Sequence, residues 1–275
     1  MKACASHLTK KAITQHFIKY IARGKRGPAC RVGLWRVLRA VLYRLQTGMQ
    51  WRCLPMQTLF GSQKVSYKTV YYHFNKWAKN GSLEVVHSKL LSLYPKKLRT
   101  GVCALDGTHT RCSRNCQASG WQGRKKAITT NLLLLTDNQG LPLALAEPLA
   151  GTHNDLYQAD KALRKMVDGL QQAGLRTQGI FLNADAGFDS QALQNSMQLY
   201  GMQPNVHPNP RAGQLERSQI FDAKLYRHRF KVERTNAWFD ACRAVRFRYD
   251  RLVQTWKASL HLAACCIILD KLNLW

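Results

Sequence analysis

The sequence predicts a helical region followed by a mixed α/β domain, and three observations lead to this fold class. Within residues 1–98, apolar side chains recur at helical spacing, as in the run from Leu34 to Leu45. From about residue 99, short apolar runs alternate with amphipathic stretches, as expected of a mixed sheet covered by helices. Hydrophobic residues make up 45% of the 275 residues, which is enough for a sizeable core. We therefore expect two regions, residues 1–98 and residues 99–275.

The first region contains two clear helix patterns. One helix ends at Gly48, and a second begins near Ser66 and ends near Gly81. Lys68 and Tyr71 lie on the outward side of the second helix. Short helices that carry basic and aromatic residues outward are typical of a helix-turn-helix, although other small helical bundles share the pattern. The pattern favours DNA binding through Lys68 and Tyr71.

The second region alternates between strand and helix patterns. A turn cluster at residues 137–140 joins two apolar runs and indicates a hairpin. Residues 204–222, which contain three prolines, are expected to form a loop insertion, and residues 223–251 a long basic helix, whole or broken. The remaining expected elements are strands at Val102–Leu105, Ile128–Thr136, Leu141–Leu149 and Ile180–Ala184, a helix capped by Asn154 and ended by Gly174, a helix at Asp189–Tyr200, and a packing helix at Trp256–Leu272.

The charge balance points to a polyanionic partner. Lys and Arg number 42 against 15 Asp and Glu, which gives a formal net charge of +27. Contacts of these cations with phosphates release counterions and give affinity that does not depend on base sequence. A basic ribosomal or structural protein would share the charge but would usually have a lower apolar content. Because the basic residues are spread along the chain, we expect several surfaces that contact double-stranded DNA.

The nine cysteines are odd in number and scattered, and no secretory leader is visible, so we expect reduced thiols and a cytoplasmic location. A protein that binds DNA is also expected to associate with the nucleoid. A zinc site at Cys103, His109, Cys112 and Cys116 is a weaker alternative, because the spacing lacks a close Cys-x-x-Cys pair. The C-terminal packing helix is interrupted by charged residues, so no membrane segment is expected.

Three carboxylates are the candidate catalytic residues. Asp106 and Asp185 each close an apolar strand pattern, and Glu233 lies in the basic stretch of residues 226–234. A carboxylate at the end of a buried strand is costly unless it meets a proton or a cation. Two such aspartates would bridge one Mg²⁺ ion, for which Mn²⁺ could substitute, and Glu233 would complete a second site. Without metal, the aspartates should repel each other and raise the apparent pKa of the pair.

Each carboxylate also has a structural interpretation that stays open. Asp106 could be an ordinary turn or helix-cap residue after a strand, and Asp185 could belong to a strand-to-helix turn. Glu233, among several basic residues, could be a salt-bridge partner on a helix.

Several segments, taken in order, resemble the DDE transposases of bacterial insertion sequences. The matching segments are Gln46–Pro55, Leu105–Thr108, Gly123–Lys125, Asn183–Asp189 and Tyr226–Trp238. The resemblance covers nearly the whole chain. It implies an RNase H-like catalytic domain in which Asp106, Asp185 and Glu233 form the metal-binding triad. The chain departs from the family at Asp240 and Ala186, where relatives often carry a basic residue, and Arg243 is a candidate replacement for the first of these.

The resemblance implies a transposase that binds terminal inverted repeats, cuts DNA at the ends of its element and joins the 3′ hydroxyl to target DNA. Tyr226 and Arg229, spaced to share a helix face with Glu233, are expected to contact phosphates beside the cut, or else to be a stacked surface pair. Residues 124–126, which are Arg124, Lys125 and Lys126, are candidates for holding target DNA, or else form a solvated charge run. A homodimer on DNA would hold two ends. The alternatives are a purely hydrolytic RNase H-like nuclease and a non-catalytic or decayed DNA-binding regulator.

Overall fold

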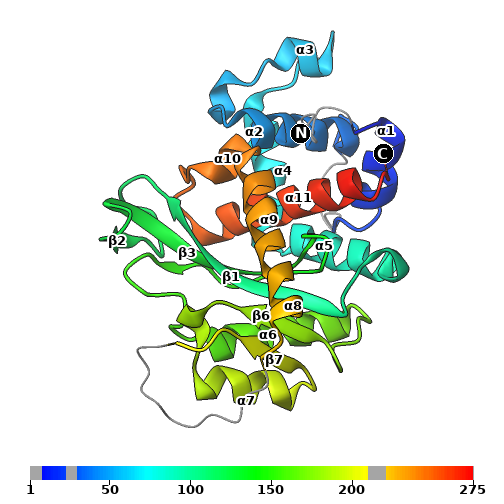
Figure 1. Cartoon of the computed structure of the whole chain (residues 1–275). Coiled ribbons are helices and arrows are strands. Elements are labelled where there is room, and N and C mark those ends of the chain that lie inside the picture. Colours follow the sequence, from blue (N-terminus) through cyan, green and yellow to red (C-terminus); the bar gives the residue numbers. More distant parts are fainter. Residues whose placement is uncertain (1–7, 23–29, 210–220, 275) are drawn as a thin grey trace. The chain divides into compact units, whose positions relative to one another are not determined.

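The computed structural model describes residues 8–22, 30–209 and 221–274 (Figure 1). The chain forms two compact units that interleave along the sequence. The first contains the described parts of residues 1–90, 113–117 and 238–275, and the second contains residues 91–112 and 118–237. The expected division between residues 98 and 99 remains a prediction about domains, and the two units are described separately below.

The first unit is helical, as expected for the N-terminal region. The helix ends that the sequence predicts are present: Gly48 adopts a left-handed φ of 69°, and the Ser66 side chain accepts a hydrogen bond from the Lys68 N–H. The elements of this unit are α1 (Lys10–Ile13), the π-helix η1 (Thr14–Ile18), α2 (Leu34–Thr47), η2 (Trp51–Cys53), α3 (Met56–Phe60), α4 (Tyr67–Lys79), most of α5 (Ser82–Leu93), α10 (Arg243–Arg246) and α11 (Val253–Lys271).

The core of the first unit contains a buried ion pair. The Arg44 guanidinium donates two hydrogen bonds to the Asp250 carboxylate, at 3.1 and 3.2 Å, and both side chains are about nine-tenths buried. The same guanidinium lies 4.7 Å from the ring centroid of Trp51, which also packs on Phe74. A buried guanidinium needs a counter-ion. The Arg44–Asp250 pair therefore ties α2 to the segment before α11.

Helix α11 confirms the expected packing helix, and nearly all of its residues from Thr255 to Leu269 are buried. Across the described ranges, every helix is too short or too polar to span a bilayer.

The second unit contains the sheet. Its strands are β1 (Val102–Arg111), β2 (Gly120–Gln122), β3 (Ala127–Thr136), β4 (Pro142–Leu145), β5 (Leu149–Ala150), β6 (Phe181–Ala184) and β7 (Gln203–Val206). Its helices are η3 (Pro95–Lys97), α6 (Ala159–Gln172), η4 (Ala186–Phe188), α7 (Gln191–Leu199), α8 (Ala223–Tyr226), η6 (Arg227–Phe230) and the first part of α9 (Lys231–Asp240).

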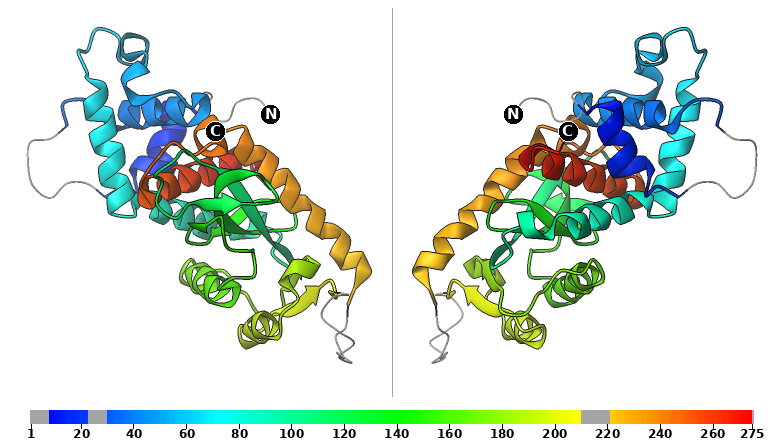
Figure 2. Two further views of the ribbon diagram at one scale, coloured as in Figure 1. Left: turned by 90° about the vertical axis from the view of Figure 1, so that its left-hand side faces the viewer. Right: turned by 90° about the vertical axis from the view of Figure 1, so that its right-hand side faces the viewer.

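The sheet is mixed, and its order is β2-β3-β1-β6-β7, with β4 and β5 also paired to β3. Strand β3 runs antiparallel to β1, whereas β6 is parallel to β1 and β7 is parallel to β6. Helix α6 packs against β3 and β4, and α8 and η6 pack against β1, β6 and β7. Figure 2 shows these two groups of helices on opposite sides of the strands. This arrangement confirms the expected mixed sheet flanked by helices.

Some expected boundaries in the second unit were wrong. The strand expected at Val102–Leu105 continues to Arg111, because residues 107–111 pair with residues 129–133 of β3, so Asp106 lies inside a strand and not at its end. The loop expected at 204–222 begins with part of β7, because residues 203–206 pair with β6, and residues 210–220 lie outside the described residues. The expected cap Asn154 instead accepts a hydrogen bond from the Tyr157 N–H in a turn before α6. The basic segment after residue 222 is a broken helix.

Candidate active site

Asp106 and Asp185 are brought together by the parallel pairing of β1 and β6. Ala104 of β1 is the register partner of Asn183 of β6. Asp106 lies two residues further along β1, and Asp185 lies two residues beyond Asn183, directly after the end of β6. Asp185 also caps the turn η4, because its Oδ1 accepts a hydrogen bond of 2.9 Å from the Gly187 N–H. The structural interpretation of Asp185 is therefore correct, and it is compatible with a place in the site.

The surroundings of Asp106 disfavour its charged form. The pKa of Asp106 is raised from 3.8 to about 6, and burial is the largest cause. The charge of the nearby Arg229 guanidinium and a hydrogen bond from the Gly107 backbone oppose this rise, whereas the negative charges of Asp185 and Asp155 add to it. Repulsion by Asp185 contributes to the raised pKa of Asp106, as expected for adjacent carboxylates, but burial is the larger cause. A carboxylate held among other acids in a largely buried place suits a proton or a cation.

Arg229, whose positive charge lowers the pKa of Asp106, lies on η6, which packs on β1 and β6. Its guanidinium lies 5.7 Å from the ring centroid of Tyr226 and 5.0 Å from that of Phe230. Its Nε is buried and has no hydrogen-bond partner in the part of the chain that the structure describes. Tyr226 and Arg229 therefore make a cation–π contact near Asp106, and their contact with phosphates stays a prediction.

Glu233 is exposed near the start of α9. Helix α9 is fixed on the turn between β3 and β4, where Lys231 Nζ donates to Asn138 Oδ1 at 2.9 Å and Thr235 Oγ1 donates to the Gly140 carbonyl. Among the described residues, no three Asp, Glu, His or Cys side chains lie close enough together to hold a metal ion. The structure thus brings Asp106 and Asp185 together but does not bring Glu233 to them. In the same described residues, Cys103, His109, Cys112 and Cys116 do not form a group that could hold zinc.

The sequence interpretation missed Asp155, which lies against the same part of β1. Its Oδ1 accepts a 2.8 Å hydrogen bond from Asn131 Nδ2 and lies 3.6 Å from His109 Nε2. Burial raises the pKa of Asp155, but the interactions with His109 and Asn131, together with the charge of Arg124, outweigh burial and bring this pKa below its ordinary value. A Cβ on Gly107 would overlap the Asp155 carboxylate, so the glycine after Asp106 makes room for it. The only sequence signal was a polar run, residues 151–155, after an apolar one.

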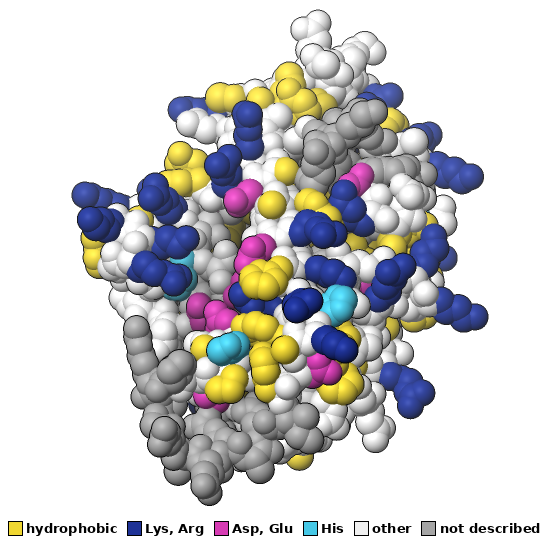
Figure 3. Space-filling model, viewed as in Figure 1, with side chains coloured by type: hydrophobic (Ala, Val, Ile, Leu, Met, Phe, Trp, Pro, Cys, Tyr) yellow, Lys and Arg dark blue, Asp and Glu magenta, His cyan; other side chains and the backbone are white. Residues whose placement is uncertain are grey.

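The predicted DNA-contacting residues are distributed over both units. Arg124, Lys125 and Lys126 are exposed in the turn between β2 and β3, and Figure 3 shows basic side chains gathered over the β2 end of the sheet. In the first unit, Lys68 and Tyr71 are exposed on α4, and Arg243 begins α10.

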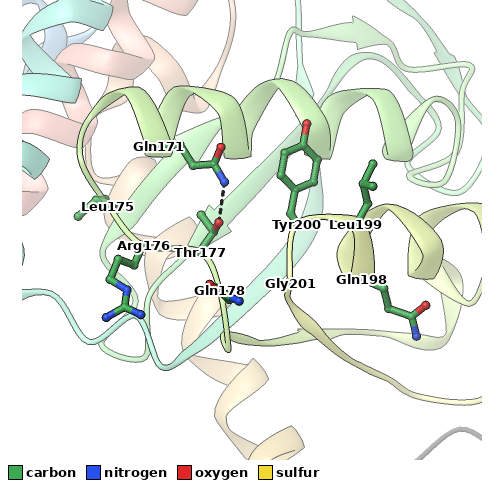
Figure 4. Close-up of a pocket in the computed structure, with 9 residues that line it drawn as sticks. All are labelled: Gln171, Leu175, Arg176, Thr177, Gln178, Gln198, Leu199, Tyr200 and Gly201. Carbon is green, nitrogen blue, oxygen red and sulfur yellow. Dashed lines mark hydrogen bonds between the residues drawn. The ribbon is translucent and has the colours of Figure 1, made fainter.

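A hollow of about 470 Å³ lies at the opposite ends of the strands (Figure 4). It is lined by residues that precede β6 and β7, among them Arg176, Thr177 and Tyr200. Gln171 Nε2 donates to Thr177 Oγ1 at 2.9 Å across its wall. Because Asp185 follows the other end of β6, this hollow is separate from the candidate active site.

Comparison with known protein families identifies the family of this chain. Residues 97–269 match the family described as Transposase DDE domain, which covers more than half of the chain. This chain belongs to the DDE transposase family. Residues 11–87 also match a family described as a putative transposase of the IS4/5 family. The helical segment and the sheet of this transposase therefore both have relatives among bacterial insertion sequences.

One relative is a putative transposase for insertion sequence element IS402 from Burkholderia cepacia, which is 29% identical over 146 residues. The match covers 51% of this transposase and 63% of the relative, so the chain spans less than two thirds of that relative's length.

Two solved structures are remotely similar. A Mos1 transposase paired-end complex with left transposon end has 12% identity and a TM-score of 0.30, with 83% of this chain and 82% of that chain covered. A Mos1 mariner paired end complex with Mn has 13% identity and a TM-score of 0.31, with 88% and 79% covered. Similarity at this level carries no argument about function.

Proposed function

We propose that this transposase binds the terminal inverted repeats of its own element, cuts DNA at the element ends and joins the freed 3′ hydroxyl to target DNA. Residues 1–98 would serve as the helical DNA-binding region and residues 99–275 as the catalytic domain. The observation that carries this proposal is that Asp106 of β1 and Asp185, directly after β6, lie close together where these two parallel strands pair, with the pKa of Asp106 raised to about 6. In a chain of net charge +27, a concentrated acidic pair is unusual and suits metal-dependent chemistry on a polyanion.

The acidic pair fits a divalent metal ion of the hard, oxygen-preferring kind. Mg²⁺ is held in many phosphoryl-transfer sites by one or two carboxylates, with water and substrate phosphates as the remaining ligands. Asp106 and Asp185 would supply these carboxylates, and Mn²⁺ would substitute for Mg²⁺. When bound, such ions neutralise charge on the phosphate and activate the attacking oxygen.

The other residues would act on the DNA. Arg229, whose charge acts on Asp106, would pair with a phosphate next to the cut, and its cation–π contact with Tyr226 would help to orient it. Lys125 and its basic neighbours would hold target DNA through the backbone phosphates. Glu233 would join the aspartates only after the start of α9 moves. We propose that bound metal and DNA drive this movement, because a metal ion attracts the Glu233 carboxylate and a phosphate attracts the Arg229 guanidinium.

Binding of element ends is assigned to the first unit. Lys68 and Tyr71 are exposed on α4, where they could contact phosphates and bases, and Arg243 would add a further phosphate contact. Two ends must be held at once for concerted joining, so we propose that the protein acts as a homodimer on DNA.

The test is a strand-transfer assay with pre-cut end DNA and a supercoiled target plasmid, in Mg²⁺ or Mn²⁺. The wild-type protein should give joined product, and Asp106→Asn and Asp185→Asn should abolish it while binding of end DNA persists. Cleavage without joining would favour a purely hydrolytic nuclease. If wild-type and Asp106→Asn proteins bind ends equally and neither cuts nor joins, the chain is a non-catalytic DNA-binding regulator and the proposal fails.

A further inference from the structure

Trp121 is a large apolar side chain that the fold leaves in solvent. It lies in β2 and is 60% exposed, although tryptophan is usually highly buried. Its strand is followed at once by Gly123, Arg124, Lys125 and Lys126, all of which are exposed. An exposed aromatic ring beside three cations is typical of surfaces that bind single-stranded or distorted nucleic acid.

Strand β2, which carries Trp121, makes contacts with neighbouring segments through the residues on either side of Trp121. Gln122 Nε2 donates to the Gly151 carbonyl at 3.1 Å and lies 3.3 Å from His109 Nε2. A Cβ on Gly120 would come within 2.7 Å of Thr152, so residues 151–152 pack directly on the strand. At the tip, the Lys126 N–H donates to the Gly123 carbonyl at 3.2 Å and closes the turn. The exposed Trp121 ring therefore lies on a strand and turn whose backbone is fixed by these contacts.

The side chains of Trp121 and Asp106 project from the same face of the sheet. Trp121 is the register partner of Ile128, and Asp106 is the partner of Leu134, six residues further along β3. Partners across a ladder share a face, and so do residues an even number apart on one strand. The contact of Gln122 with His109 agrees, because both belong to the opposite face, on which Asp155 lies.

The spacing along this face suits DNA. Six residues of strand span about 20 Å, because a strand rises by about 3.3 Å per residue. A duplex advances about 3.4 Å per base pair, so a strand with its reacting phosphate at Asp106 would pass Trp121 about six nucleotides away. The exposed cations of the turn would hold the backbone there.

We propose that Trp121 and the basic turn of residues 124–126 form a base-stacking site for unpaired or distorted DNA, about six nucleotides from the reacting phosphate. This inference rests on the proposed function, because it takes DNA as the substrate. The ring stacks on an exposed base, and Arg124, Lys125 and Lys126 contact the flanking phosphates. Stacking of this kind tolerates any base sequence, since every base has a π-face.

The experiment compares two labelled DNA probes of the same length and composition, one fully paired and one with a mispaired central bubble. The full-length wild-type protein should bind the bubble probe more tightly than the paired probe. Trp121→Ala should weaken bubble binding by about tenfold and leave binding of the paired probe nearly unchanged. Trp121→Phe should retain most of the bubble preference because it keeps an aromatic face. Trp121→Leu is the matched control, because it keeps apolar bulk without that face and should behave like Trp121→Ala.

The outcomes separate this inference from the function on which it rests. If the wild-type protein binds paired end DNA and all three variants keep the wild-type preference for the bubble, the stacking site is refuted and the proposed function stands. If Trp121→Leu behaves like the wild type while Trp121→Ala does not, the surface is an apolar protein contact and the stacking site is also refuted. If the wild-type protein binds neither probe, both proposals fail. Melting temperatures close to wild type are expected for all variants, since Trp121 is 60% exposed.

Discussion

Replacing Asp106 with asparagine should change how the stability of the metal-free protein depends on pH. The pKa of Asp106 in the folded protein is about 6, against an ordinary value of 3.8, with burial as the main cause. Between pH 3.8 and about pH 6 the folded protein binds more protons than the unfolded chain, so the free energy of unfolding falls as pH rises. A rise from 3.8 to about 6 corresponds to about 3 kcal/mol, because a tenfold change in proton affinity is worth about 1.4 kcal/mol.

The stabilising contribution of protonated Asp106 is fully present below about pH 4 and is lost above about pH 6. An asparagine at this position carries no charge at any pH, so the Asp106→Asn variant should not show this loss. The measurement is the free energy of unfolding in urea, in a chelating buffer, for both proteins at about pH 4 and about pH 7. Between these two conditions, the wild-type protein should lose about 3 kcal/mol more than the variant.

Adding a divalent metal ion to both proteins gives a control for the same experiment. Divalent metal at about pH 7 should stabilise the wild-type protein and have little effect on Asp106→Asn, because only the wild type offers two charged carboxylates. Parallel pH profiles for the two proteins in chelator would refute the burial of a charged Asp106 as described. They would also remove the main electrostatic support for the candidate site.

Gly107→Ala should destabilise the protein by about 1–3 kcal/mol, measured by urea unfolding, since the new Cβ overlaps the Asp155 carboxylate; Gly123→Ala, at an open place in the described chain, should change stability far less. Asp250→Asn should cost about 3–5 kcal/mol by the same measurement, because it leaves the buried Arg44 cation unpaired, and a loss below about 1 kcal/mol would contradict the buried pair. Lys125→Gln should lower DNA affinity at low salt and reduce the slope of log affinity against log salt by about one, whereas an unchanged slope would show that Lys125 contacts no phosphate.

Much of the fold could be predicted from local signals. Gly48 and Ser66 mark helix ends by mechanisms that act within one turn, so their effect depends little on the rest of the chain. The strand before Asp185 was visible because a mostly apolar run of five residues, 180–184, precedes it. The extension of β1 past Asp106 was not visible, since residues 107–111 are mostly polar and become a strand only through pairing with β3.

The acidic pair could be predicted from the sequence, whereas the place of Glu233 could not. The sequence spacing of Tyr226, Arg229 and Glu233 assumes a continuous α-helix, but residues 227–230 form a 3₁₀ segment. A 3₁₀ helix turns about 120° per residue and an α-helix about 100°, so four residues rotate the start of α9 by about 80°. Tyr226 and Arg229 consequently make a cation–π contact with each other, and Glu233 is exposed to solvent.

The close approach of Gly107 to Asp155 makes two distant positions of the chain depend on each other during evolution. A larger residue at 107 could be accepted only if the side chain at 155 became shorter or turned away, with loss of its bonds to His109 and Asn131. Substitutions at 107 and 155 should therefore co-vary among related insertion-sequence proteins, and a lineage that changes one of them alone would have to rebuild this part of the sheet.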